Sequence, residues 1–329
     1  MFFISKTRNK LISRRNRPNK HCCVFLLSLS LLYTHLQADI SEFFKPALEK
    51  PTPSFLRGVD FIYMINLDER TEKWHLSLEQ LIPYNIIPYR FSAVNGWTLP
   101  LDAFEKLGVR LAPGMSTDHM GTCYSIDNQG IGSHEMVNVL GKTYFCHCMS
   151  RGAIGIVLSH LSVLQDAYDS GYETIWVMED DIQVIHNPHH LSDLIELLDK
   201  TVGKDQWDIL FTDRDSKDSH GRYVPCASYA WRPNFTPDNP HKFIFRNKIG
   251  TCFLQLGSRY GAYSMILRRS GIKKMLDFMN MHHIFLPYDM EYYLPNDMQL
   301  YSLEYDVVST LPGAPSDNGI NNYYETIEK

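Results

Sequence analysis

Short apolar segments of strand length alternate along the chain with longer segments in which apolar residues recur at helical spacing. From residue 59 onward this alternation predicts a single α/β domain, with a mostly parallel mixed central sheet flanked by helices. Ligands of such sheets bind at the carboxyl ends of the strands, so residues that directly follow a strand are the first functional candidates. The predicted strands are 59–67, 86–96, 173–178, 207–212 and 300–309, the predicted helices are 68–81, 150–172 and 189–202, and 261–279 is predicted as strand, turn and helix.

Residues 97–150 are less regular and are rich in Gly, Ser and His. We expect a helix followed by a long loop here, and loops of this length are often functional. The C-terminal tail beyond residue 309 is also predicted as a loop.

The first 58 residues differ from the rest of the chain. Residues 5–21 carry seven Lys and Arg and no acid, and a mostly apolar run follows at 22–33. This pattern is typical of a signal peptide, and the run is shorter than the roughly 20 residues of a membrane span. We therefore expect 1–38 to be a signal peptide or a short signal-anchor and 39–58, with three prolines, to be a linker. The protein would then be exported or membrane-associated, with an internal start and a cytoplasmic location as the alternative.

Composition narrows the class of protein. The net charge is −5 and the isoelectric point is about 6.3, so no overall basic field is present to bind nucleic acid. Five cysteines follow the N-terminal segment, and an odd number rules out complete internal pairing. A zinc site around Cys146 and Cys148, with Cys123 and His134, is an alternative, but Cys-x-Cys lacks the usual two-to-four-residue gap. Ordinary, partly buried thiols are the favoured interpretation.

The stretch "ETIWVMEDDIQV" carries the strongest chemical signal, because an apolar strand runs directly into Glu179, Asp180 and Asp181. Three adjacent like charges repel one another unless water or a cation balances them. One interpretation is a solvated strand end or a turn cap. The other is a Mg²⁺ or Mn²⁺ site, since such ions commonly bridge one or two carboxylates to the phosphates of a substrate.

Several phosphate chemistries can be tested against the sequence. "LGKT" at 140–143 has the end of a P-loop, but the required first glycine falls at Met136. No G-x-G-x-x-G follows the first strand, and the residues after it lack the paired acids of an aspartyl phosphatase. A nucleotide-sugar transferase remains compatible, because it needs a metal at a strand end, a nucleotide pocket and a base for an acceptor hydroxyl.

Four segments resemble glycosyltransferase family 25, the lipooligosaccharide and collagen galactosyltransferase family. They are "FIYMINLDERTEKW", "YRFSAVNG", "GAIGIVLSHLSVLQDAYDSGYETIWVMEDDIQV" and "GAYSMILRRSGIKKML", in the family's order across about residues 59–280. The resemblance implies a GT-A-like catalytic domain over 59–329 that uses a nucleotide sugar as donor, UDP-galactose in the first instance, and usually Mn²⁺. The acceptor would be a hydroxyl on a glycan, a lipooligosaccharide or a protein.

Roles for individual residues follow from position and from the resemblance. Glu179, Asp180 and Asp181 are the metal candidates, and strand alternation would point Glu179 and Asp181 to the same side. Asn66 could read a uracil edge and Arg70 could grip phosphate, the alternatives being a strand-end cap and a solvated helix charge.

The remaining candidates lie further along the chain. Ser159 and His160 would lie near the donor sugar, although a structural role for them is slightly favoured. Asp289 is the candidate base for an inverting transfer, with Asp297 and Glu291 as alternatives and a surface carboxylate as the plain interpretation. The pairs His189-His190 and His282-His283 are interpreted as surface or loop residues.

Two other functions stay open at this point. A glycoside hydrolase would need two carboxylates at a fixed separation across a sugar, which a sequence does not measure. A transferase fold without turnover would bind a nucleotide or a glycan, but the intact Glu179-Asp180-Asp181 argues against such degeneration.

Overall fold

The computed structural model describes residues 39–51, 56–118, 120–127, 132–314 and 316–319. The predicted signal peptide or signal-anchor at 1–38 lies outside the described residues, and so does part of the predicted linker. Among the described residues, no helix combines the length and the apolar character needed to cross a lipid bilayer.

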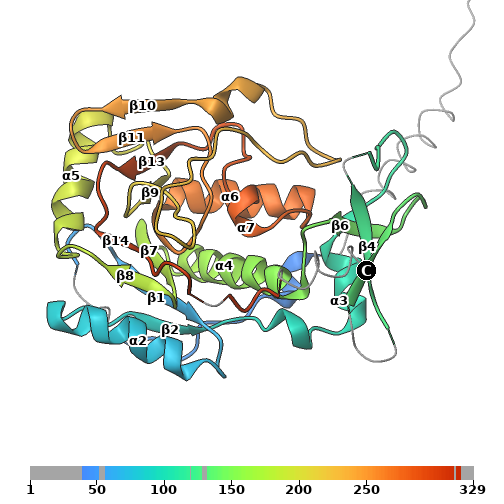
Figure 1. Ribbon diagram of the computed structural model, residues 1–329, viewed down its shortest axis with the longest axis horizontal. Coiled ribbons are helices and arrows are strands. Elements are labelled where there is room, and N and C mark those ends of the chain that lie inside the picture. The colour runs from blue at the N-terminus through green and yellow to red at the C-terminus, as the bar shows by residue number, and fades with distance from the viewer. Residues whose placement is uncertain (1–38, 52–55, 119, 128–131, 315, 320–329) are drawn as a thin grey trace, which may run out of the picture. The chain divides into compact units, whose positions relative to one another are not determined.

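A mixed eight-stranded sheet forms the centre of the domain (Figure 1). Its strands are β1 (Phe61–Asn66), β2 (Tyr89–Ser92), β7 (Thr174–Glu179), β9 (Ile209–Phe211), β10 (Arg246–Ile249), β11 (Phe253–Leu256), β12 (Ser264–Arg268) and β13 (Leu300–Leu303). Their order is β10-β11-β13-β9-β12-β7-β1-β2. Three neighbouring pairs are parallel (β1/β2, β1/β7 and β13/β9) and four are antiparallel. The mixed α/β sheet is thus confirmed, but a mostly parallel one is wrong, because β12 runs antiparallel between β7 and β9.

Helices cover both faces of the sheet, as alternating side chains of β1 require. Phe61, Tyr63 and Ile65 point into the core shared with α4 (Arg151–Asp169) and α6 (Arg269–His282), whereas Ile62 and Met64 point into the core shared with α2 (Thr71–Leu81) and α5 (His190–Val202). This follows the two-residue side-chain period of a strand buried on both faces.

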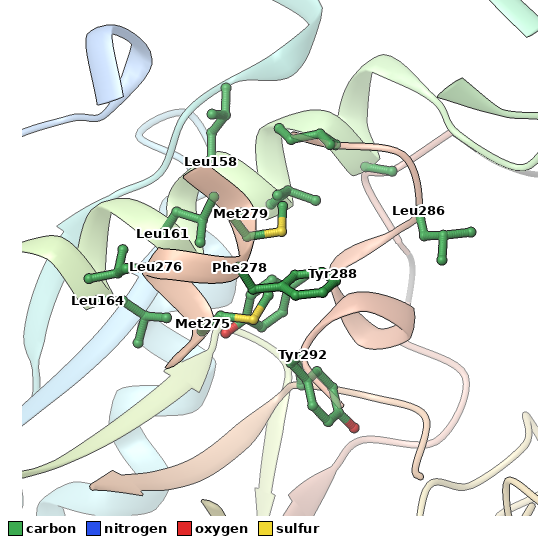
Figure 2. Close-up of a cluster of buried hydrophobic side chains, with 14 of the residues drawn as sticks. Leu158, Leu161, Leu164, Met275, Leu276, Phe278, Met279, Leu286, Tyr288 and Tyr292 are labelled. Carbon is green, nitrogen blue, oxygen red and sulfur yellow. The ribbon is translucent and has the colours of Figure 1, made fainter. Parts of the chain in front are cut away.

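The contact between α4 and α6 is part of the first core. Figure 2 shows Leu158, Leu161 and Leu164 of α4 facing Met275, Leu276 and Met279 of α6, with Tyr288 and Tyr292 close by. Each fully buried side chain of this size contributes roughly 1.5–3 kcal/mol relative to an exposed one. The contact therefore holds α4 firmly against the sheet.

The ends of α4 agree with the sequence prediction. The Ser150 side chain accepts a hydrogen bond from the backbone N–H of Ala153 (3.0 Å) and so caps the first turn. The helix ends at Asp169, ahead of Ser170 and of Gly171, which has a φ of +74°.

Residues 97–150 form more structure than the predicted helix and loop. After α3 (Leu101–Leu107), four antiparallel strands lie in the order β3-β6-β4-β5: β3 (Val109–Arg110), β4 (Gly121–Ile126), β5 (Gly132–Met136) and β6 (Thr143–Cys146). The long loop is therefore wrong. The pattern was missed because β5 is largely exposed on both sides and lacks an apolar alternation.

The remaining elements are short. They are η1 (Ile40–Phe43), η2 (Ile82–Tyr84), η3 (Gly96–Thr98), β8 (Ile182–Val184), η4 (Pro240–Ile244), α7 (Tyr288–Glu291) and β14 (Val308–Thr310). The predicted strand at 300–309 is two strands, since β13 joins the central sheet and β14 pairs with β8.

Residues 39–51, predicted as a linker, belong to the same compact unit as the rest of the described chain. Ile40 is buried, and the ammonium group of Lys45 donates to the Ser92 side chain and to the backbone oxygen of Ala93. The Lys50 side chain pairs with Asp166 (2.9 Å). This segment therefore braces β2 and α4.

Candidate functional site

A cleft opens at the carboxyl ends of β1 and β7, between α4 and the loop that follows β2. Its empty space, with the open mouth included, is about 680 Å³. Six sequence candidates line it: Asn66, Ser159, His160, Glu179, Asp180 and Asp181. The strand-end rule therefore located the cleft correctly.

Backbone-to-backbone contact shapes one wall of this cleft. A Cβ atom at Gly155 would lie 2.5 Å from the carbonyl oxygen of Val94, and one at Gly96 would overlap the carbonyl oxygen of Arg151. Ser159 strengthens the contact, because its hydroxyl accepts from the backbone N–H of Val94 (2.8 Å). The same hydroxyl donates to the Gly155 carbonyl (2.7 Å), so Ser159 joins α4 to the loop that follows β2.

Glu179, Asp180 and Asp181, here called the cleft acids, lie where β7 turns into β8. The strand ends at Glu179, and Asp180 and Asp181 form the turn, so the alternation expected if the strand continued through Asp181 does not apply. Glu179 bonds to the imidazole of His160 (2.9 Å), and Asp180 accepts a hydrogen bond from the amide of Asn66 (2.6 Å). The Oδ1 atom of Asp181 is buried and has no hydrogen-bond partner.

The electrostatics of the cleft acids favour a cation. Burial, followed by the negative charges of Glu179 and Asp180, raises the pKa of Asp181 to about 7. Burial also raises the pKa of Asp180, against the hydrogen bond from Asn66. A cation near these oxygens would relieve both the repulsion and the missing hydrogen bond of Asp181.

These carboxylates suit Mn²⁺ or Mg²⁺, because hard cations prefer oxygen ligands. Within the described part of the chain, however, no three His, Cys, Asp or Glu side chains converge on a ready-made metal site. The arrangement fits a cation held by one or two carboxylates and completed by substrate phosphates. It does not fit a closed protein cage.

Asn66 is engaged differently from the prediction. Its amide nitrogen donates to Asp180 and to the backbone oxygen of Arg70 (2.9 Å), and its amide oxygen accepts from the Nε of Arg90 (2.8 Å). The side chain is 1% exposed, so these bonds occupy it in place of a uracil edge. Asn66 positions Asp180.

Lys73 brings positive charge to the cleft, and Arg70 adds a second cation next to it. Arg70 is the N-cap residue of α2, and Lys73 lies in the first turn of that helix. The guanidinium of Arg70 pairs with Glu72 (2.8 Å), and both cations contact Asp317, Lys73 at 2.6 Å and Arg70 at 3.3 Å.

His160 and Asp289 both lie near Glu179. The His160 ring stacks on Tyr288, with centroids 4.1 Å apart, and its buried Nδ1 has no hydrogen-bond partner. Asp289 follows Tyr288 in α7 and accepts from the backbone N–H of Gly261 (3.3 Å). Burial raises the pKa of Asp289, the nearby charge of Glu179 raises it further, and His160 opposes this. Asp289 is absent from the side chains that line the cleft, but the charges of Glu179 and His160 both influence its pKa.

The alternatives to Asp289 fit a base less well. Glu291 is fully buried and forms an ion pair with Arg232 (2.5 Å), so its carboxylate is already paired. Asp297 has a 72% exposed side chain beside Lys274.

The histidine and cysteine candidates outside the cleft make contacts within the protein. His283 lies in the loop that follows α6, but it is buried, with its Nδ1 beside the Lys106 carbonyl. Cys146 and Cys148 are free thiols with sulfur atoms 3.1 Å apart, and His134 bonds to Thr122. The ordinary-thiol interpretation fits these contacts better than zinc.

Lys73, Trp97 and Asp317 are among the cleft residues that the sequence candidates did not include. Lys73 could have been found from its spacing to Arg70 on a predicted helix. Asp317 gave no signal, because its place depends on a contact between residues more than 200 positions apart.

Comparison with known proteins places the chain among glycosyltransferases. The model of glycosyltransferase family 25, described as LPS biosynthesis protein, matches residues 59–291. A mouse protein named inactive glycosyltransferase 25 family member 3 is 26% identical over 158 residues, which are 48% of this chain and 22% of the mouse protein. A glycosyltransferase 25 family member of Aedes aegypti is 24% identical over 184 residues, 56% of this chain and 26% of its own length. Procollagen galactosyltransferase 1 of Danio rerio is 25% identical over 126 residues, 38% of this chain and 17% of its own length. The chain thus matches only about a quarter or less of each of these relatives.

Proposed function

The chain belongs to glycosyltransferase family 25, and on that premise we propose that it is a metal-dependent glycosyltransferase. It would transfer a hexose, galactose in the first instance, from a nucleoside diphosphate sugar to a hydroxyl group. The acceptor would be a glycan, a lipooligosaccharide or a protein, and residues 1–38 would direct the enzyme to or across a membrane.

One observation carries this proposal: the cleft acids include a buried oxygen, Asp181 Oδ1, without a partner, and they share their cleft with Lys73, which contacts Asp317 together with the neighbouring Arg70. Carboxylates alone would repel a diphosphate, and cations alone would leave the carboxylates unbalanced. A cation and a diphosphate together satisfy both sets of charges.

Asp181, with Glu179 or Asp180, would hold Mn²⁺ or Mg²⁺ against the diphosphate. The cation would supply neutralisation of the negative charge that grows on the leaving diphosphate. His160 would hold Glu179 in place through its 2.9 Å bond, and Asn66 would do the same for Asp180.

Asp289 would take the proton from the acceptor hydroxyl as the new bond from its oxygen to the anomeric carbon forms. The bond from that carbon to the diphosphate breaks, and its electron pair leaves with the diphosphate, so the configuration inverts. The raised pKa of Asp289 suits this role, since a carboxylate that binds its proton more tightly is a stronger base.

Calorimetric titration with UDP, with and without Mn²⁺, tests the first half of the proposal. We expect binding that depends on Mn²⁺, because the cleft acids need the cation before they tolerate a diphosphate. Metal-independent binding, or none, would contradict it.

Turnover tests the second half, and the inactive family member among the relatives makes this step necessary. Hydrolysis of a panel of nucleotide sugars with Mn²⁺ should release UDP, most rapidly from UDP-galactose if galactose is the donor sugar. Metal-dependent UDP binding without turnover of any donor would identify a binding protein on the transferase fold.

A further inference from the structure

The chain passes the cleft a second time near its C-terminus. After β14, the backbone N–H of Leu311 donates to the carbonyl oxygen of Asp181 (2.8 Å), so the tail starts beside the cleft acids. Residues 316–319, here called the C-terminal strap, then follow, and Ser316, Asp317 and Asn318 line the cleft.

The C-terminal strap fits a surface shaped for it. The indole N–H of Trp97 donates to the backbone oxygen of Asp317 (3.2 Å), and the Ser150 hydroxyl donates to that of Asn318. A Cβ atom at Gly152 would lie 2.6 Å from the Cα of Asn318. Because these contacts reach the backbone of the strap, they hold its path whatever side chain it carries at position 317.

Asp317 adds one charged side chain to this path, and its carboxylate contacts two cations, Lys73 of the cleft and the neighbouring Arg70. Its Oδ2 is 2.6 Å from the ammonium nitrogen of Lys73, and its Oδ1 is 3.3 Å from Nη1 of Arg70. The Lys73 side chain is only 11% exposed, so its charge is largely withheld from water and needs an anion.

We propose that Asp317 occupies the place of a donor phosphate on Lys73 and Arg70, so that the C-terminal strap is an internal competitor that the donor displaces. This rests on the proposed function and deepens it, because it makes Lys73 a diphosphate-binding residue. Two oxygens of one carboxylate on two cations reproduce the bridging geometry of a phosphate group.

Charge and mass action explain how the exchange works. A carboxylate tethered to the same chain acts at an effective concentration in the millimolar range or above, so a weak contact keeps it in place. A diphosphate carries more negative charge than one carboxylate and also brings a metal ion to the cleft acids. The donor therefore displaces Asp317 from the two cations. Its apparent affinity is nevertheless reduced, because in a fraction of the molecules the strap blocks these cations.

The opposite role for the strap would be a clamp that closes over bound donor and adds affinity. Asp317 argues against a clamp, since its negative charge would face the negative diphosphate across the same two cations. The two roles predict opposite signs for the same substitution.

The test uses Asp317→Asn, which keeps the size of the side chain and removes its charge. We expect UDP with Mn²⁺, and inorganic pyrophosphate without nucleotide, to bind about threefold to tenfold more tightly than to the wild-type chain, as loss of one to two charge-assisted contacts implies. Uridine, which lacks phosphate, should bind unchanged. Asp277→Asn is the matched control, because Asp277 forms an exposed pair with Lys273 on α6, and it should change none of these affinities.

Lys73→Gln removes one of the two cations and leaves Asp317 in place. It should weaken UDP and pyrophosphate binding about tenfold or more and leave uridine binding unchanged.

Unchanged or weaker pyrophosphate binding in Asp317→Asn would overturn the inference, and weaker binding would identify the strap as a clamp. If the wild-type chain binds pyrophosphate but no UDP, the proposed function fails, while the pyrophosphate arm still decides the role of Asp317.

Discussion

Two groups of carboxylates lie at the same edge of the central sheet, and they are built in opposite ways. The cleft acids follow β7. The second group, here called the paired acids, consists of Asp213 and Asp215 after β9 and Asp306 after β13. Because β7 and β9 both run antiparallel to β12, their carboxyl ends share one edge.

Each paired acid has its own cation within the protein. Asp213 pairs with the fully buried Arg259 (2.5 Å), Asp215 with Arg246, and Asp306 with Lys217 (2.6 Å). Burial acts to raise the pKa of Asp306, but hydrogen bonds from Lys217, from the Arg214 backbone and from Tyr223 outweigh it, so the pKa lies below its usual range.

The cleft acids are supported by neutral or weakly basic groups instead. Asp180 is held by an amide, Glu179 by an imidazole, and Asp181 keeps one buried oxygen without a partner. Burial raises the pKa of both Asp181 and Asp213, but neighbouring acids add to the rise at Asp181, whereas Arg259 opposes it at Asp213. Acids paired within the protein hold the fold together, and acids left unbalanced mark the place of a ligand cation.

Asp289 belongs with the cleft acids by this criterion, since a backbone N–H is its hydrogen-bond partner and burial raises its pKa. Asp289→Asn should lower the rate of sugar transfer by about 10²–10⁴-fold, the usual contribution of a positioned base. UDP binding with Mn²⁺ should stay unchanged, because the base acts on the acceptor. A decrease below about tenfold would make Asp289 a bystander, and Asp297→Asn and Glu291→Gln would be tested next.

Asp213→Asn tests the structural side of the comparison. It leaves Arg259 fully buried without a counter-ion, so the free energy of unfolding should fall by about 3–5 kcal/mol. Urea unfolding at pH 7 without metal measures this loss. Asp181→Asn under the same conditions should be neutral or slightly stabilising, because it removes a buried like charge. Equal losses of unfolding free energy in the two variants would contradict the distinction between paired acids and cleft acids.

The pH dependence of stability gives a second test of the difference between the cleft acids and the paired acids. The pKa of Asp181 is about 7 in the folded chain and near 3.8 when unfolded, so Asp181 favours folding at low pH and this contribution is lost as pH rises toward 7. Since one pKa unit equals 1.36 kcal/mol, and solvent screens a residue that is only partly buried, the loss should be on the order of 2 kcal/mol. Urea unfolding in EDTA between pH 4 and pH 7 measures it. Asp181→Asn should flatten the slope, and an unchanged slope would refute the assignment.

Much of the fold could be predicted because its signals are local. The strands β1 and β7 are short apolar runs, and α4 has a Ser cap, a Gly stop and a continuous apolar face. β1 and β7 are parallel neighbours, so they end at the same edge, and Asn66 at the end of β1 contacts Asp180 after β7.

The rest depends on contacts that no local pattern contains. The four-stranded antiparallel sheet pairs exposed strands such as β5, and β10 and β11 form a hairpin at the far edge of the central sheet. At the site, Asn66 was predicted as a candidate residue, but its bond to Asp180 was not predicted, because that bond joins residues 114 positions apart. Asp317 and Lys73 were not predicted as cleft residues, because their pairing depends on the path of the tail.

The most direct test of the account compares one acid from each group in the same titration. Asp181→Asn and Asp306→Asn are made separately, their folding is checked by circular dichroism, and each is titrated with UDP in the presence of Mn²⁺. We expect Asp181→Asn to abolish Mn²⁺-dependent binding of UDP and Asp306→Asn to retain it, because only Asp181 has an oxygen left for a cation. Wild-type affinity in folded Asp181→Asn, or the same loss in both variants, would contradict the claim that the unbalanced acids are the metal-binding ones.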